Sequence, residues 1–324
     1  MEQIILENVV KEYRVAKKKK GILGAIVNLF HSEKITVEAV KGISCKIGKG
    51  EIVGYIGPNG AGKSTTIKMM AGIMHPTSGT LTVNGLSPQK NRKEVVRNLG
   101  VVFGQRTQLY WDLRLGESFE LLRRIYRVPA EQFQATMEEL NGVLGLEAFM
   151  DIPVRQLSLG QRMRGELAAA MIHSPDILFL DEPTIGLDID AKQAVRDFIL
   201  EINRRRGTTV ILTSHDLEDV VKLCTRLIVI NKGVIVEDGP LEEIISRMAT
   251  YRMLILELAE PVELVKCQKV EVTKMQGRKL WCRFDHHLHT ATEIIYELGQ
   301  EMKIMDFSVR EPDVEDAISN IYHC

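Results

Sequence analysis

The 324-residue sequence has few cysteines, few aromatic residues and no excess of charge of either sign. Its five cysteines are Cys45, Cys224, Cys267, Cys282 and Cys324. No two of them form a C-x-x-C pair, so the spacing indicates neither a zinc site nor a disulfide framework and predicts reduced thiols. Aromatic residues make up 6% of the chain, too few for an obvious surface on which nucleic-acid bases stack.

Charge and hydropathy argue against two further classes of protein. Lys and Arg number 42 and Asp and Glu number 43, so the net charge is -1. The chain therefore lacks the excess of basic residues that is typical of nucleic-acid-binding proteins. The apolar run Gly21–Phe30 has ten residues, whereas a helix needs about 20 to span a bilayer. The N-terminal residues do not resemble a secretory signal. We therefore expect a chain that does not cross a membrane by itself and that binds no nucleic acid.

Short apolar runs alternate with helical patterns over most of the chain. Ile52–Ile56, Leu99–Phe103 and Ile177–Leu180 are typical of buried strands, and apolar residues at helical spacing lie between them. This alternation predicts an α/β fold, a largely parallel sheet covered on both faces. The helix-rich stretch 106–173 is expected to form a subdomain beside that sheet.

Two segments depart from this alternation of strands and helices. Residues 15–36, which include four consecutive lysines, are interpreted as an insertion between two strands. From about residue 247 the pattern predicts a small α+β module of split βαβ type. Its expected elements are strands at 253–258, 269–273, 279–284 and 303–309 and helices near 290–298 and 312–322. The predicted domains are therefore 1–246 and 247–324.

A phosphate-binding loop follows the first buried strand. The sequence Gly57-Pro58-Asn59-Gly60-Ala61-Gly62-Lys63-Ser64-Thr65 fits G-x-x-x-x-G-K-[ST], with a strand before it and a helix after it. Glycines permit tight curvature, and the backbone N–H groups at a helix N-terminus suit a polyphosphate. Lys63 is expected to reach the β- and γ-phosphates, and the Ser64 hydroxyl is expected to bind Mg²⁺.

A pair of acidic residues ends a later buried strand. In ILFLDEP, at 177–183, the strand delivers Asp181 to its carboxyl end, where phosphates bind in open α/β sheets. A carboxylate there holds Mg²⁺, and Glu182 is placed to polarise a water molecule for attack on the γ-phosphate. The phosphate loop and this acidic pair together predict a nucleoside triphosphatase.

The segment just before that strand carries a family resemblance. Leu157-Ser158-Leu159-Gly160-Gln161 resembles the LSGGQ signature of the ATP-binding subunits of ABC transporters, with Leu at the third position. A serine and glycine amides at a helix N-terminus again suit a phosphate. The resemblance, which spans about residues 2–245, implies a P-loop ABC-type ATPase core. It also implies that Ser158, Gly160 and Gln161 bind the γ-phosphate of ATP held by a second subunit in a head-to-tail dimer.

Four further residues match the family in order, and their roles are what the resemblance implies. Gln105, in VVFGQ, looks like the glutamine that contacts Mg²⁺ or the attacking water and senses the membrane subunit. Asp188 looks like the aspartate that reaches across the dimer, and His215, in TSHD, like the switch histidine that contacts the γ-phosphate. Tyr13 resembles the aromatic residue that stacks on adenine, although a core tyrosine is a fair alternative.

A narrower likeness concerns the type of transporter. VVFGQRTQLYWDL, LSLGQRMRGELAAA, the early insertion and REPDVEDAISNIY resemble the ATPases of bacterial ABC-2-type exporters, whose permeases are separate proteins. The resemblance implies a peripheral protein at the cytoplasmic face of the membrane, with ATP and Mg²⁺ as its cofactors. Its implied partners are a permease and a second ATPase subunit.

A soluble ABC ATPase acting on DNA or the ribosome is the rival function. It is disfavoured because the chain has a single phosphate loop, no heptad insertion between Lys63 and Asp181, and a neutral charge. Two roles stay open. The insertion 15–36 either touches anionic lipid or the permease, or is a solvated loop. The C-terminal module supports dimerisation or regulates the ATPase, and its His286, His287 and His289 are interpreted as polar residues at a strand end rather than metal ligands.

Overall fold

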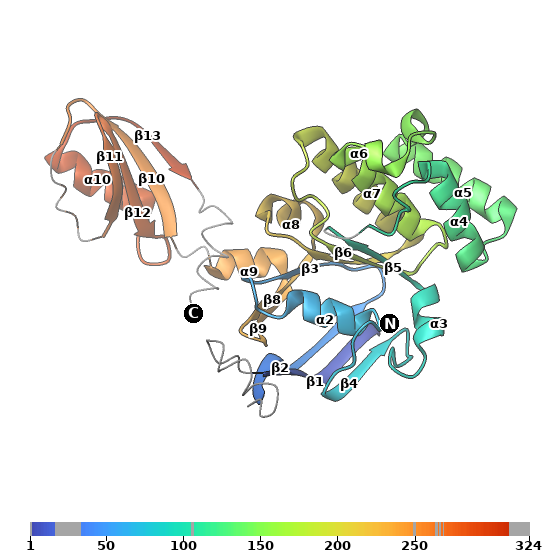
Figure 1. The fold of residues 1–324 in the computed structure, drawn as a ribbon. Coiled ribbons are helices and arrows are strands. Elements are labelled where there is room, and N and C mark those ends of the chain that lie inside the picture. The colour runs from blue at the N-terminus through green and yellow to red at the C-terminus, as the bar shows by residue number, and fades with distance from the viewer. Residues whose placement is uncertain are drawn as a thin grey trace, which may run out of the picture. The chain divides into compact units, whose positions relative to one another are not determined.

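The structure is a computed structural model that describes residues 2–16, 34–104, 107–248, 251–262, 265, 267 and 269–310. The chain forms two compact units, Met1–Pro240 and Leu241–Cys324 (Figure 1). The division between units comes just before helix α9 (Leu241–Met248), slightly earlier in the chain than the domain boundary expected from the sequence at 246.

A six-stranded sheet organises the first unit. Its order is β5 (Leu99–Phe103), β6 (Ile177–Asp181), β7 (Thr209–Thr213), β3 (Ile52–Ile56), β8 (Arg226–Asn231) and β9 (Val234–Pro240). The first five strands are parallel, and β9 returns antiparallel to β8. The central strands are buried along nearly their whole length, which explains their uninterrupted apolar runs. The α/β fold predicted from the sequence is confirmed.

A second, three-stranded antiparallel sheet lies beside it, in the order β2 (Lys34–Gly48), β1 (Glu2–Ala16) and β4 (Ser78–Val83). Helix α2 (Lys63–Met70) runs between the two sheets (Figure 1). Its Ile67 and Met69 are fully buried in one core cluster with residues of both sheets. Most of the insertion expected at 15–36 lies outside the described residues, since β1 ends at Ala16 and β2 begins at Lys34.

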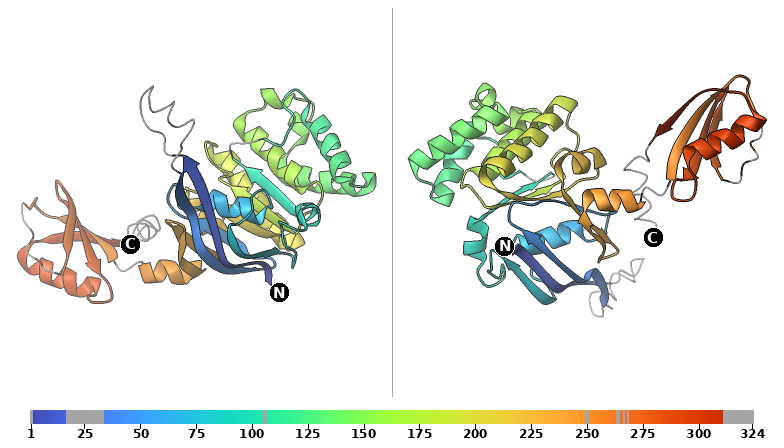
Figure 2. Two further views of the ribbon diagram at one scale, coloured as in Figure 1. Left: turned by 60° about the horizontal axis from the view of Figure 1, so that its bottom comes forward. Right: turned by 180° about the vertical axis from the view of Figure 1, so that it is seen from behind.

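The helical subdomain is also present. Helices α4 (Leu115–Tyr126), α5 (Ala130–Leu144) and α6 (Leu159–Met171) gather on the side of the large sheet away from the three-stranded sheet (Figure 2). Between α5 and α6 the chain makes two short 3₁₀ helices, Glu147–Phe149 and Val154–Gln156. Among the described residues of this unit, the other helices are α3 (Arg92–Arg97), α7 (Ile189–Arg206) and α8 (Leu217–Leu223).

The second unit has a four-stranded antiparallel sheet in the order β11 (Glu271–Gln276), β12 (Lys279–Asp285), β10 (Tyr251–Leu258) and β13 (Ile304–Arg310). Strands β12 and β13 flank β10 and both run antiparallel to it, so they are parallel to each other. Helix α10 (Ala291–Glu301) connects them, which completes the split βαβ motif predicted from the sequence. The helix expected at 312–322 lies outside the described residues. Among the residues that the structure describes, no helix is long and apolar enough to span a bilayer.

The central sheet is expected to determine the stability of the first unit. Phe179, on β6, is fully buried, so Phe179→Ala should lower the free energy of unfolding by about 3–5 kcal/mol, because the cavity adds to the lost transfer free energy. Ile125 on α4 is 55% exposed, and Ile125→Ala should change stability by no more than about 0.5 kcal/mol. Urea denaturation followed by circular dichroism compares them; equal midpoints for the two variants would contradict this account of the core.

Candidate functional site

The carboxyl ends of β3, β5, β6 and β7 meet at one edge of the sheet, where a cavity of about 510 Å³ opens. This position is where open α/β sheets bind ligands. The cavity is lined by Asn59, Ser64, Lys68, Ile73, Phe103, Gly104, Asp181, Glu182, Ile185 and His215. The structure therefore brings residues of the phosphate loop, the acidic pair and the predicted switch histidine to a single site, although they are far apart in the sequence.

The phosphate loop is fixed by close backbone packing. A Cβ atom at Gly57 would lie 2.0 Å from the carbonyl oxygen of Ile230 on β8, so no other residue fits there. Gly62 precedes α2 with a φ of 112°, a left-handed conformation that favours glycine. The chain thus turns sharply from β3 into α2, and the helix begins with its unpaired N–H groups beside the cavity, an arrangement suited to an anion.

Lys63, the first residue of α2, lies under this loop. Its ammonium donates hydrogen bonds to the carbonyl oxygens of Gly57 at 2.5 Å and Pro58 at 3.3 Å. Burial lowers the pKa of Lys63, and the nearby carboxylates of Glu182 and Asp181 act in the opposite direction. A buried cation next to helix N–H groups concentrates positive potential at the place where phosphates would lie.

Asp181 is held from two sides. The Thr213 hydroxyl donates to Asp181 Oδ1 at 2.7 Å, and the Ser64 hydroxyl donates to Oδ2 at 3.3 Å. A hydroxyl and one carboxylate, with room for water, form the sparse oxygen set that Mg²⁺ accepts together with phosphate oxygens. The described residues contain no group of three or more His, Cys, Asp or Glu side chains arranged to hold a metal ion. This site thus fits an ion bound mainly through substrate and water.

Glu182 and His215 are in direct contact. His215 Nε2 lies 2.8 Å from Glu182 Oε1. Glu182 adopts a left-handed backbone conformation, with a φ of 57°, and its N–H donates to the Thr213 carbonyl oxygen at 3.0 Å. A non-glycine residue in this region is strained, and such strain often occurs where a functional side chain must point in one direction. Both side chains line the cavity, where a carboxylate can accept a proton from water.

The signature residues are placed elsewhere. Ser158 caps α6: its hydroxyl accepts from the Gln161 N–H at 3.2 Å, and its own N–H donates to Gln161 Oε1 at 2.9 Å. Ser158 is exposed, and neither it nor Gly160 nor Gln161 lines the cavity. Asp188 is also exposed and caps α7 by accepting from the Ala191 N–H at 2.8 Å. Ser158 and Asp188 are therefore available at the surface, and Gly160 and Gln161 are half-buried beside Ser158.

For two predicted residues, Tyr13 and Gln105, a place in the site stays a prediction. Tyr13 is half-buried on β1, where its hydroxyl donates to Met74 Sδ at 3.0 Å and the Lys11 ammonium lies 5.6 Å from its ring centroid. It does not line the cavity, and its stacking on adenine stays a prediction. Gln105 lies outside the described residues, directly after Gly104, which lines the cavity.

Sequence reasoning missed Glu166, a buried glutamate on α6. Its carboxylate accepts from the Thr107 hydroxyl and from the Gln108 N–H at 3.2 Å, and its own carbonyl accepts from Gln108 Nε2 at 3.0 Å. Burial raises the pKa of Glu166, and these hydrogen bonds oppose that change. The signature helix is thus tied to the chain segment just after Gln105. A charged residue within the apolar stretch of α6 is the sequence signal that could have revealed it.

A second missed feature joins α7 to α8. Arg196 Nε lies 2.6 Å from Asp219 Oδ1, and both residues are buried. The Thr184 hydroxyl donates to Asp219 Oδ2 at 2.5 Å. Thr184 follows the acidic pair by two residues and Asp219 follows His215 by four. This buried network therefore fixes the two segments that follow Glu182 and His215. Nothing in the local sequence pattern indicates that its members pair.

Comparisons with known proteins agree with the geometry. A family model described as "ABC transporter" matches residues 40–185. The chain is 37% identical over 215 residues to the ABC transporter ATP-binding protein NatA of Bacillus subtilis, covering 66% of this chain and 87% of NatA. It is 30% identical over 290 residues to the linearmycin resistance ATP-binding protein LnrL of the same organism, covering 87% of this chain and 93% of LnrL. A methionine import ATP-binding protein MetN of Geobacillus kaustophilus is 32% identical over 247 residues, which are 74% of this chain and 72% of MetN.

Solved structures resemble about three quarters of the chain. A dimeric ATP-binding cassette, MJ0796, bound to ADP and Pi in a post-hydrolysis state, matches with a TM-score of 0.61 and 27% identity. The match covers 74% of this chain and 98% of that cassette. Another dimeric structure of MJ0796 matches with a TM-score of 0.60 and 28% identity, over the same shares of the two chains.

The Thr213–Asp181 hydrogen bond allows a test of the proposed ion site. Thr213→Val removes that donor at nearly constant volume, and we expect the Mg²⁺ concentration needed for nucleotide binding to rise about tenfold, because loss of such outer contacts weakens metal binding. Mg²⁺ titration of a fluorescent ATP analogue measures it. Thr80→Val, at an exposed position on β4, is the control. An unchanged Mg²⁺ midpoint in a folded Thr213→Val protein would exclude this role of Thr213.

Proposed function

The chain belongs to the ABC transporter family of ATP-binding proteins, and we propose that it hydrolyses ATP to drive a separate membrane permease of the ABC-2 export type. One observation carries the proposal for hydrolysis: Ser64, Asp181, Glu182 and His215 line a single cavity at the mouth of a phosphate loop. A chain that only bound nucleotide would not need an acid–histidine pair beside the ion site. The proposed reaction is the one general to ABC ATPases, in which ATP and water give ADP and phosphate.

Each residue of the cavity has a role in this reaction. Lys63 and the backbone N–H groups of residues 59–65 hold the β- and γ-phosphates. Ser64 and Asp181 hold Mg²⁺, which when bound neutralises charge on the phosphate oxygens. Glu182 orients the attacking water and accepts its proton. His215, whose Nε2 lies 2.8 Å from Glu182 Oε1, contacts the γ-phosphate when ATP binds.

A second copy or a homologous chain completes the site. Ser158 and Asp188 cap their own helices at the surface and do not reach the cavity of their own chain. In a head-to-tail dimer the signature of one subunit faces the γ-phosphate bound by the other, and the dimeric MJ0796 structures support this assembly. ATP can close such a dimer only to the extent that it binds the closed state better than the open one.

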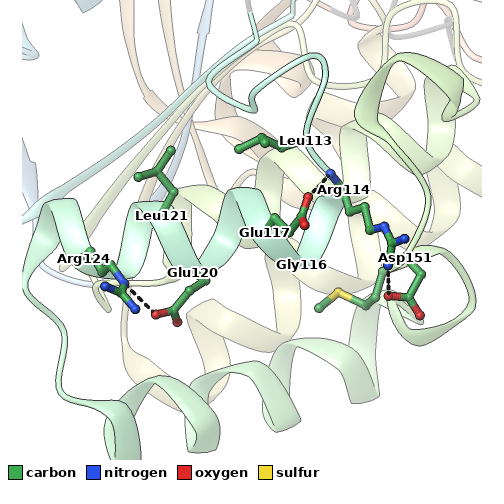
Figure 3. A pocket seen from close by; sticks show the side chains of 9 residues that line it. Leu113, Arg114, Gly116, Glu117, Glu120, Leu121, Arg124 and Asp151 are labelled. Atoms are coloured by element: carbon green, nitrogen blue, oxygen red, sulfur yellow. Dashed lines mark hydrogen bonds and ion pairs between the residues drawn. The ribbon is translucent and has the colours of Figure 1, made fainter.

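The helical subdomain offers the docking site for the permease. A groove of about 520 Å³ on α4 is lined by Leu113, Arg114, Gly116, Glu117, Glu120, Leu121, Arg124, Met150 and Asp151 (Figure 3). Apolar side chains lie beside two ion pairs, Arg124–Glu120 at 2.9 Å and Arg114–Asp151 at 3.7 Å. Apolar surface flanked by charges of both signs suits a short amphipathic helix. The Glu166 contacts tie the segment leading to this groove to the signature helix.

The direction of transport is part of the proposal. The match to LnrL, named for linearmycin resistance, covers 93% of that protein, whereas the match to MetN, named for methionine import, covers 72%. Together with the ABC-2-type motifs around Gly104 and Ser158, this favours export. Mg²⁺ as the metal and the cytoplasmic face of the membrane as the location belong to the same proposal.

Glu182→Gln tests the catalytic assignment. We expect the variant to bind ATP and to dimerise with it, but to hydrolyse it at least about a hundredfold more slowly, since general-base catalysis contributes this much or more. Phosphate release and sedimentation with ATP measure the two properties. Glu138→Gln, at an exposed position on α5, controls for the loss of one charge. Near-normal hydrolysis by Glu182→Gln would remove Glu182 from its role as base.

The permease and its docking site are tested together. Tagged protein is recovered from native membranes in mild detergent, and co-purifying proteins are identified by mass spectrometry. We expect a stoichiometric polytopic partner, whose recovery falls several-fold with Leu121→Glu because a charge is placed in the groove, while ATP hydrolysis by the isolated subunit is unchanged. Leu200→Glu, on the exposed side of α7, is the control.

The outcomes distinguish the transporter function from the position of the docking site. Full recovery of the permease by Leu121→Glu would place the docking site elsewhere and leave the transporter function standing. Recovery only from the soluble fraction, with ribosomal or DNA-bound proteins, would overturn the transporter function in favour of a soluble ABC ATPase.

A further inference from the structure

The C-terminal unit carries an exposed apolar edge. Within the described residues, β13 is an outer strand of the four-stranded sheet. Its Met305, Phe307 and Val309 are 63%, 53% and 39% exposed. An outer strand with unpaired N–H and C=O groups is a template for pairing with another strand, and proteins normally keep apolar side chains away from such edges.

The opposite edge of the same sheet is protected in the usual way. On β11, the Glu271 carboxylate is bound to Arg283 of β12 at 2.6 Å, and the Lys274 ammonium lies 5.0 Å from the ring centroid of Trp281. Charged side chains on an outer strand discourage further pairing. Met275 on β11 is also 48% exposed, so exposed apolar side chains alone do not distinguish the two edges. The charged side chains of β11 are held by β12, whereas none of the described residues forms an ion pair with Asp306 or Arg310 of β13.

The two faces of β13 have different chemistry. Phe307 and Val309 lie opposite Leu256 and Leu254 of β10, which are fully buried in the core that includes α10. They therefore extend this apolar face past the edge of the sheet.

The charged residues of β13 project from its other face. Asp306 and Arg310 lie opposite Glu257 and Met253 of β10, with Ser308 midway between them in the strand. An acid and a base two positions on either side of a small central residue are complementary under a two-fold axis through that residue.

We propose that β13 pairs with β13 of a second copy of this chain, antiparallel and centred on Ser308, so that the two sheets join. In this register Asp306 of each copy faces Arg310 of the other, and Phe307 of each copy faces Val309 of the other, so each pair forms twice. A two-fold contact of this kind uses the same patch on both partners, and opposite charges and apolar pairs placed directly across strands stabilise the ladder.

The local hydrogen bonding of β13 fits this register. The Phe307 N–H donates to Asp306 Oδ1 at 2.8 Å, so the carboxylate satisfies a donor on the strand itself. Pairing replaces this acceptor with the carbonyl oxygen of Val309 in the second copy. The Asp306 carboxylate is then released to bind the Arg310 guanidinium, a charge-assisted contact.

This contact differs from the head-to-tail dimer of the proposed function. It uses none of the residues of the phosphate loop or the signature, and it needs no nucleotide. The full-length chain should therefore self-associate without ATP, and the result does not depend on whether the chain hydrolyses ATP or drives a permease.

Exchange of the two charges tests the register. In nucleotide-free analytical ultracentrifugation of the full chain, Asp306→Arg alone and Arg310→Asp alone should each raise the dimer dissociation constant about tenfold or more, because each places like charges face to face. The double variant Asp306→Arg/Arg310→Asp should restore the wild-type constant. Mixing the two single variants should give a heterodimer, because a strand with arginine at both positions then faces a strand with aspartate at both.

The control adds the same charge to the opposite edge. Gln276→Arg, on β11, should leave self-association unchanged. Wild-type protein that stays monomeric without nucleotide up to its limit of solubility would overturn the proposal. Dimers that resist both single exchanges would also overturn it, as would a double variant that fails to recover.

Discussion

The fixed position of the Asp181 carboxylate is the constraint on which the site depends. Thr213 on β7 holds one oxygen and Ser64 on α2 holds the other, so one side chain joins β6, β7 and the phosphate loop. Because the central strands are buried on both faces, a change of register would move differently sized side chains out of close-packed positions in the core. The sheet thus sets the distance between phosphate loop and acid before any ligand binds, and this preorganisation is what electrostatic catalysis requires.

Buried polar groups extend this constraint outward. Removing a charge from water is costly unless it is paired, so each such group fixes its partners in place. The Arg196–Asp219–Thr184 network holds the segments around Glu182 and His215, and Glu166 holds the loop after Gly104 against the signature helix. The Glu166 contacts join the helical subdomain directly to the signature helix, whereas the Arg196–Asp219–Thr184 network supports the segments that follow Glu182 and His215.

The features that sequence predicted are those encoded locally. The apolar runs of the central strands, the glycines of the phosphate loop and the serine at the N-terminus of the signature helix each act within a few residues. The features it missed depend on contacts between distant segments. Nothing near Glu166 indicates Thr107, and nothing near Asp219 indicates Arg196, because the burial that forces each pairing exists only in the fold. Tyr13 shows the same limit, since its hydroxyl contacts Met74, far along the chain.

The two units present surfaces that differ in what they need from a partner. The first unit exposes Ser158 and Asp188, whose proposed ligand is a nucleotide held by another chain, so that contact forms only with ATP. The β13 edge of the second unit is complementary to the same edge of another copy. This second contact therefore requires only a sufficient protein concentration and no nucleotide. Chains already joined through β13 would meet their ATP partner at an effective concentration set by the connection between the units.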